Sequence, residues 1–197
     1  FEGTVLDGAP VFNLVRHALP ASQVTGFQAI LNSTSNFILS AMEEGVSSED
    51  ALRRAQALGI AEEEPMYDLE GWDAAAKTAI LINALMNGET TPLEISRTGI
   101  QSLSIRRILE AHQQGRRFKL LSEARRENGS ILARVSPRLL PLTNPLAHVN
   151  GTAAALTLHT DLLGPVTITL HKGELQQTAY AILADLNSIV STYYATR

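Results

Sequence analysis

The sequence predicts an α+β domain in which helices pack on one face of a mixed, mostly antiparallel sheet. Apolar residues recur at helical spacing through much of the first half of the chain, whereas alternating patterns with turn signals dominate the second half. Helices first and antiparallel strands later are typical of a sheet that is covered by helices. We find no strand followed by a glycine-rich loop and a helix, the unit that would indicate a Rossmann domain.

The helices of the first half are predicted from apolar spacing and from their end signals. Pro10 suits the first position of a helix over 8–18. Ser47 or Ser48 caps a later helix, and Gly59 ends it. In chain order, we expect a helix at 8–18, a strand at 23–32, a helix at 34–44, a helix from 47 or 48 to 58, and a helix at 71–86.

Turn signals separate the strands of the second half. Asn128-Gly129 lies between two segments of alternating pattern and is the strongest short hairpin signal. A second turn, at 161–164, separates two further strands. In chain order, we expect a helix at 102–114, strands at 117–126, 130–136, 152–160 and 166–170, and a final helix at 175–190.

Length and composition are those of an ordinary globular protein. We assign residues 1–197 to one domain, which is long enough to bury a full core. The formal charge is −4 without a basic block, which argues against nucleic acid as a partner. No apolar run approaches the ~18 residues of a membrane span and no signal-peptide layout is present, so we expect a cytoplasmic protein without membrane contact.

Cysteine and histidine chemistry is not expected. The chain has no cysteine, and its five histidines are scattered without the spacing of metal ligands. The chain begins with Phe1 rather than methionine, within a strand-like segment. We therefore expect it to be a piece of a longer protein.

The segment 55–77 carries the candidate chemistry. One helix ends at Gly59, an acidic loop follows, and the next helix begins near Gly71 with Asp73 and Lys77 four residues apart on one face. The ordinary interpretation is a surface ion pair. Against it, the neighbouring side chains are small or apolar, and a lysine that is not solvated must be paired, neutral or functional. The residues alone leave ion pair and active site equally open.

Two more polar segments are candidates for binding. Glu62 to Glu64 and Asp68 are first interpreted as a solvated surface. A carboxylate pair beside a lysine nevertheless suits a zwitterionic substrate, whose ammonium the carboxylates would receive and whose hydroxyl the lysine would meet. The segment 32–36 is interpreted as a helix N-terminus, where free backbone N–H groups can bind a carboxylate, and Thr34 can serve both as cap and as ligand.

These residues resemble the signature of homoserine dehydrogenases. Residues 55–77 read Ala-x-x-x-Gly-Ile-Ala-Glu and then Asp-Leu-x-Gly-x-Asp-x-x-x-Lys, which is similar to that signature almost letter for letter. The stretch 32–38 resembles the family's Asn-Gly-Thr-Thr-Asn-Tyr-Ile, and 2–5 and 8–10 resemble its Glu-Ala-Thr/Ser-Val and Gly-x-Pro. Similarity continues to residue 185, so it covers essentially the whole chain.

The resemblance implies a substrate site. Lys77 would be the catalytic proton donor and acceptor at the substrate hydroxyl or carbonyl. Glu62 and Asp73 would bind L-homoserine or L-aspartate 4-semialdehyde, with Asp68 and Thr34 assisting. The family's reaction interconverts these two compounds with NAD or NADP, in threonine and methionine biosynthesis.

The resemblance also implies cofactor and cation contacts. The backbone at Gly59 would approach the nicotinamide. Glu174 stands where the family's C-terminal loop has a glycine near that ring, which adds bulk and negative charge. The family's nucleotide-binding domain, with a second active-site lysine, is not among residues 1–197. Four backbone carbonyls fall where the family holds a monovalent cation such as Na⁺, those of Glu2, Val5, Asp7 and Ala9.

Three functional hypotheses follow. The first is the substrate-binding, catalytic and dimerisation domain of a homoserine dehydrogenase, a homodimer that acts on a small amino acid and is inactive as this piece alone. The second is a diverged relative that binds an amino acid without redox activity. The altered loop at 172–177 favours it, and the intact set of Glu62, Asp68, Asp73 and Lys77 disfavours it. The third is a structural role in which the sheet only dimerises.

Overall fold

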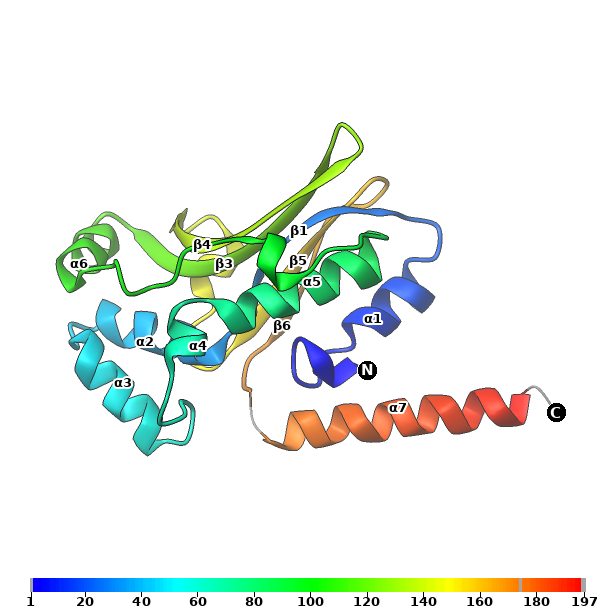
Figure 1. The fold of residues 1–197 in the computed structure, drawn as a ribbon, viewed down its shortest axis with the longest axis horizontal. Coiled ribbons are helices and arrows are strands. Elements are labelled where there is room, and N and C mark those ends of the chain that lie inside the picture. The colour runs from blue at the N-terminus through cyan, green and yellow to red at the C-terminus, as the bar shows by residue number, and fades with distance from the viewer. Residues whose placement is uncertain (1, 174, 196–197) are drawn as a thin grey trace.

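The computed structural model describes residues 2–173 and 175–195 as helices covering a sheet (Figure 1). The sheet has six strands in the order β2-β4-β3-β1-β5-β6. Within the described residues the β2–β4 pair is parallel and the other pairs are antiparallel. The predicted fold class is confirmed.

The strands predicted at 23–32, 117–126, 130–136, 152–160 and 166–170 are present, whereas the strand-like segment at the start of the chain forms a 3-10 helix at Glu2–Thr4. The strands are β1 Val24–Ile30, β2 Ser96–Arg97, β3 Arg116–Glu127, β4 Ser130–Pro141, β5 Ala154–Thr160 and β6 Gly164–Leu170. The β3–β4 hairpin turns at Asn128-Gly129, as predicted, and is longer than predicted. The two-residue strand β2 was not predicted, because it is too short to show an alternating pattern.

The predicted helices are also present. The helices are α1 Val11–Asn13, α2 Ser33–Glu43, α3 Ser48–Ala57, α4 Met66–Leu69, α5 Trp72–Leu85, α6 Ile105–Gln113 and α7 Leu175–Ala195. Side chains of Asn32, Ser47 and Ser104 cap α2, α3 and α6 by accepting a backbone N–H bond. The helix predicted at 8–18 is α1 followed by a widened turn at Leu14–Ala18. The single-turn helix α4 lies in the acidic segment that was predicted to be a loop.

Two buried clusters lie on the two faces of the sheet. Ser122 donates from β3 to the carbonyl of Ala74 in α5 at 3.5 Å, so this side chain and its same-face neighbours point toward the helices. Phe27 and Leu156 belong to the larger cluster on that side. Leu121, which immediately precedes Ser122 in β3, belongs to the smaller cluster on the opposite face, as the alternation of strand side chains requires.

The helix α7 lies apart from the sheet, at the bottom of Figure 1. It touches the start of the chain, where the amide of Glu2 donates to the carboxylate of Asp185 at 3.2 Å. In the part of the chain that the structure describes, no helix is long and apolar enough to span a membrane.

Candidate functional site

Three carboxylates and an amide gather around Lys77 where α2 and α5 begin. Asn32, the residue that caps α2, donates through Nδ2 to Asp68 Oδ1 at 2.7 Å and to Asp73 Oδ2 at 2.9 Å. The same Asp73 oxygen lies 3.0 Å from Lys77 Nζ. The third carboxylate, that of Asp7, lies within electrostatic range of both Asp73 and Lys77. The structure therefore brings together Asp68, Asp73 and Lys77, as predicted.

Local conformation explains how Asp68 reaches α5. Gly71 separates α4 from α5 and adopts a φ of 80°, a left-handed conformation that favours glycine. Its amide donates to the carbonyl of Asp68 at 3.0 Å, which closes a tight turn between the two helices. A Cβ at Gly71 would also lie 3.2 Å from Val135 of β4. This turn folds Asp68 back beside Asp73 in the first turn of α5.

Lys77 is held in a defined direction. Its Nζ donates to the carbonyl of Leu31 at 3.0 Å in addition to pairing with Asp73. The side chains of Lys77 and Asp73 are both 25% exposed, so the pair lies at the edge of the core and remains accessible. An ammonium group has three N–H donors. Two are accounted for by these partners, and no described residue is recorded as accepting the third.

The side chain of Asp7 is an unpredicted part of the site, since the family resemblance concerns only its backbone carbonyl. Burial raises the pKa of the Asp7 carboxyl, nearby Lys77 opposes that rise, and Asp73 adds to it. The residue adopts a φ of 46°, so it sits in a turn. Its Oδ2 would lie 2.8 Å from a Cβ placed on Gly173. No sequence signal announces this arrangement, because 70 positions separate Asp7 from Lys77.

Thr34 and Glu62 lie differently from their predicted places. The side chain of Asn32, not that of Thr34, accepts the capping bond of α2, so the prediction that Thr34 caps the helix is wrong. The Thr34 hydroxyl instead donates to the carbonyl of Ile60 at 3.0 Å, because it points toward the loop that follows α3. Glu62 is exposed in that loop. Its carboxylate has no recorded partner among the described residues, and its role stays a prediction.

In the segment 2–9, whose carbonyls are predicted to bind a cation, the side chain of Glu2 makes the main local contacts. The buried carboxylate of Glu2 accepts the backbone N–H groups of Phe12 at 3.0 Å and Asn13 at 2.6 Å, so it holds the start of α1. The carbonyl of Ala9 accepts the Val11 amide at 2.8 Å and retains a second lone pair. Hard carbonyl oxygens suit a monovalent cation. The described residues contain no group of three or more His, Cys, Asp or Glu side chains that could hold a metal ion.

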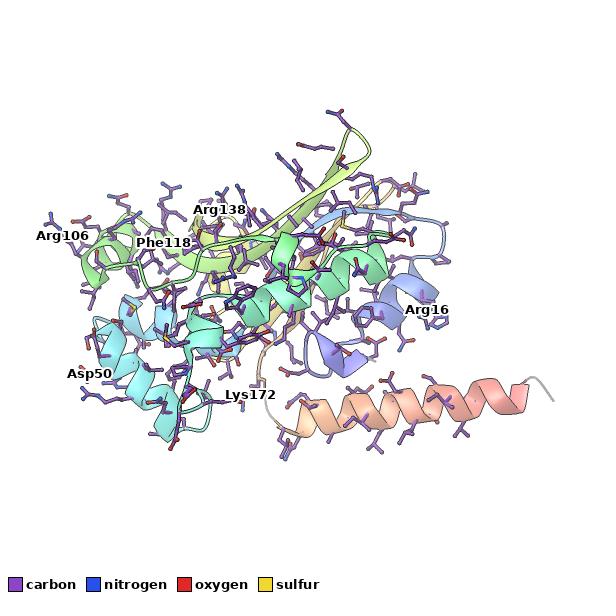
Figure 2. All side chains as sticks on the ribbon, in the orientation of Figure 1. Arg16, Asp50, Arg106, Phe118, Arg138 and Lys172 are labelled. Carbon is purple, nitrogen blue, oxygen red and sulfur yellow. The ribbon has the colours of Figure 1, made fainter. Side chains whose placement is uncertain are left out.

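The cofactor contacts implied for Gly59 and Glu174 remain predictions. Gly59 is exposed with a φ of 70°, and a Cβ there would meet nothing within 4 Å, so its backbone is open to a flat ring. Lys172, labelled in Figure 2, marks where the chain leaves the sheet toward α7. Glu174 lies outside the described residues. Residues 1–197 contain no glycine-rich loop of the kind that binds the phosphates of a dinucleotide.

Gly99 lies against the backbone at the end of α4, and we expect this close approach to be essential for the position of the helix. A Cβ on Gly99 would lie 2.1 Å from the carbonyl oxygen of Leu69 and 2.7 Å from Cα of Glu70, both backbone atoms. We expect Gly99→Ala to lower the free energy of unfolding by about 2–3 kcal/mol, because the backbone of α4 must shift. Urea unfolding measures this loss. Thr98→Ala is the control, with an expected change below about 0.5 kcal/mol, and equal stability of the two variants would contradict the prediction.

Comparison with known proteins identifies the family. The profile of the family described as homoserine dehydrogenase matches residues 10–186. The chain is 42% identical over 187 residues to an NAD(+)-dependent homoserine dehydrogenase of Pseudomonas canavaninivorans, covering 94% of this chain and 53% of the relative. It is 39% identical over 196 residues to a homoserine dehydrogenase of Neisseria gonorrhoeae, covering 96% of this chain and 44% of the relative.

Solved structures agree with the sequence relatives. The crystal structure of a homoserine dehydrogenase from Thiobacillus denitrificans superimposes with a TM-score of 0.93 at 35% identity, covering 99% of this chain and 46% of that one. The chain thus spans about half the length of the relatives it matches. A profile match over most of the chain, together with the shared fold, shows that the chain belongs to the homoserine dehydrogenase family.

Proposed function

We propose that this chain is the substrate-binding and catalytic domain of an enzyme that interconverts L-homoserine and L-aspartate 4-semialdehyde with NAD or NADP. The observation that carries the proposal is the orientation of Lys77, whose Nζ is held at 3.0 Å by both Asp73 and the Leu31 carbonyl. A fixed amine with one donor to spare can exchange a proton with a substrate oxygen. Membership of the family supports the same reaction.

Under this proposal, separate residues transfer the proton, bind the substrate ammonium and bind the substrate carboxylate. The nicotinamide, when bound, accepts or returns the hydride. As an ammonium, Lys77 gives a proton to the carbonyl oxygen when the aldehyde is reduced. In the reverse direction its neutral amine accepts the hydroxyl proton when homoserine is oxidised, which regenerates the ammonium. The carboxylates of Asp68 and Asp73, with Glu62 from the neighbouring loop, receive the substrate ammonium. The N-terminus of α2, with Thr34 in its first turn, favours the substrate carboxylate.

Turnover by the full-length gene product tests the proposal. Homoserine is supplied with NAD or with NADP, and the reduced cofactor is followed by its absorbance. We expect reduction to depend on homoserine. If the protein binds homoserine in calorimetry but reduces neither cofactor, the dehydrogenase function is refuted and the second candidate, an amino-acid-binding module without redox activity, takes its place.

Residues 1–197 on their own are expected to be inactive. The site described above offers contacts for the amino acid and an open edge for the nicotinamide, but no loop for the cofactor phosphates. The measurement is cofactor reduction by purified residues 1–197 at saturating homoserine, with the full-length gene product as the positive control. Homoserine-dependent reduction by the short chain would contradict this expectation.

We further propose a homodimer. In Figure 1 the helix α5 lies across one face of the sheet. The opposite face of β1, β3 and β4 carries a half-buried polar network in which Gln28 donates to Glu123 at 3.0 Å and Arg134 pairs with Glu123 at 2.7 Å. Such a satisfied polar patch on a broad sheet face suits contact with a second copy. Light scattering of the full-length gene product tests it, and a monomeric mass at micromolar concentration would refute it.

We also propose that a monovalent cation such as Na⁺ binds the backbone carbonyls of Glu2, Val5, Asp7 and Ala9. The tight turn at Asp7 and the cap made by Glu2 support convergence of these carbonyls. A ligand that binds only the folded state raises thermal stability. We expect a higher melting temperature in NaCl than in tetramethylammonium chloride at equal ionic strength, and equal melting temperatures would refute the site.

A further inference from the structure

Lys119 lies in β3 at some distance along the chain from every site residue named above, and it is fully buried, with 0% exposure. We propose that Lys119 is a positioning residue of the substrate site. Its ammonium ties the loop that precedes β5 to the first turn of α2, and thereby fixes the helix end that carries Asn32 and Thr34. The inference rests on the proposed function, since it concerns the same substrate site.

Direct contacts join Lys119 to this loop and to α2. The Nζ atom donates to Asn150 Oδ1 at 2.8 Å and lies 3.5 Å from Asn36 Oδ1. Asn36 is itself buried, and its Nδ2 donates to the carbonyls of Gly151 at 3.0 Å and Ala153 at 3.2 Å. Lys119 and Asn36 therefore join three segments that are far apart in the sequence: β3, the loop before β5, and α2.

A serine closes the same connection from the helix side. The hydroxyl of Ser40 donates to the carbonyl of Asn36 at 2.8 Å, and it accepts the amide of Gly151 at 3.0 Å. The loop is thus bound to α2 through a side chain in each of two successive turns. Movement of the loop without movement of the helix would break several of these bonds together.

The connection continues directly into the substrate site. The amide of Asn36 donates to the carbonyl of Asn32 at 3.2 Å, the first bond of the helix. The side-chain Nδ2 of Asn32 in turn donates hydrogen bonds to Asp68 and Asp73. Lys119 therefore supports the α2 side of the site.

The cost of burying the Lys119 ammonium indicates that this residue positions its neighbours rather than stabilising the fold. Burying an ammonium is costly, and an apolar side chain of similar volume is often as stabilising as a buried charge. The charges around Lys119 only partly offset that cost. Glu43 of α2 attracts it, while Arg117, two residues away on β3, repels it and pairs with Glu43 at 3.3 Å. A directional bond to the loop is what an apolar residue in this place would not provide.

Three variants of the full-length gene product test the proposal. Asn150 is exposed, so Asn150→Ala removes the partner of Lys119 without opening a cavity, whereas Asn150→Asp retains an acceptor. We expect Asn150→Ala to raise the KM and the calorimetric dissociation constant for homoserine about tenfold, the effect of losing a bond to a charged group. We expect kcat to change far less. Asn150→Asp should restore both constants, and Lys119→Met should behave like Asn150→Ala.

The control is Gln114→Ala, an exposed substitution at the end of α6. An unchanged KM in Asn150→Ala, or the same loss in Asn150→Asp, would overturn the proposal. Hydrogen exchange at the amides of Ser35 and Asn36 supplies a readout that needs no turnover. Faster exchange in Asn150→Ala than in the control is expected. Unchanged exchange overturns the positioning role, whereas failure of the proposed function would appear separately, as absent turnover by the unaltered protein.

Discussion

Replacing Lys77 with methionine in the full-length gene product is expected to lower kcat for homoserine oxidation by about 10²–10⁴-fold, the usual contribution of a positioned acid or base. The reason is its placement: Nζ has fixed partners in Asp73 and the Leu31 carbonyl and retains one donor. Methionine fills a similar volume without a titratable group. We expect the dissociation constant of homoserine, measured by calorimetry, to change only a few-fold, because the carboxylates and α2 remain.

The comparison of rate with affinity decides between two roles of Lys77. Loss of kcat with retained affinity indicates an interaction made in the transition state, whereas equal losses in both indicate binding alone. Arg54→Met is the matched control, since it removes an exposed positive charge on α3. Wild-type kinetics in the control are expected. Equal losses of rate and affinity in Lys77→Met would contradict proton transfer by this residue.

Much of the fold could be predicted because its signals are local. The hairpin follows from Asn128-Gly129, and the ends of α3 follow from a serine cap and from Gly59. The helix α4 is a single turn of four residues, too short for a periodic pattern. The strand β2 pairs in parallel with β4 through only two residues. Such short elements form because their neighbours hold them, so their own residues do not announce them.

In the candidate site, too, local contacts could be predicted from the sequence and tertiary contacts could not. Asp73 and Lys77 pair at i,i+4, a spacing that the sequence displays directly. Asn32 bridges two carboxylates that lie 36 and 41 positions away, and nothing in the segment 32–36 specifies those partners. The side chain of Asp7 and the Leu31 carbonyl likewise reach Lys77 only through the tertiary fold. The family signature predicts that Asp68, Asp73 and Lys77 belong to one site. How they contact one another is seen only in the three-dimensional structure.

Lys119 is expected to make the stability of the domain depend on pH under alkaline conditions. Burial lowers the pKa of its ammonium from 10.5 to about 8, with Glu43 opposing this shift and Arg117 adding to it. Between these two values the unfolded chain binds a proton that the folded chain has released, so the free energy of unfolding rises with pH. This contribution is fully present above the unfolded pKa and is lost as pH falls through about 8. A shift of this size corresponds to about 3 kcal/mol.

The difference between the unaltered protein and Lys119→Met isolates this effect. All other ionisable groups are present in both proteins, so their contributions cancel in the difference. Glu43, Arg117 and, beside Glu43, His112 of α6 are the charged and titratable groups that surround the site of the substitution, and all three are retained. We expect urea unfolding between about pH 7.5 and 10.5 to show the unaltered protein gaining stability relative to the variant as pH rises. A difference that stays constant over this window would mean that Lys119 keeps its ordinary pKa, and that its burial is offset by partners stronger than Asn150 and Glu43.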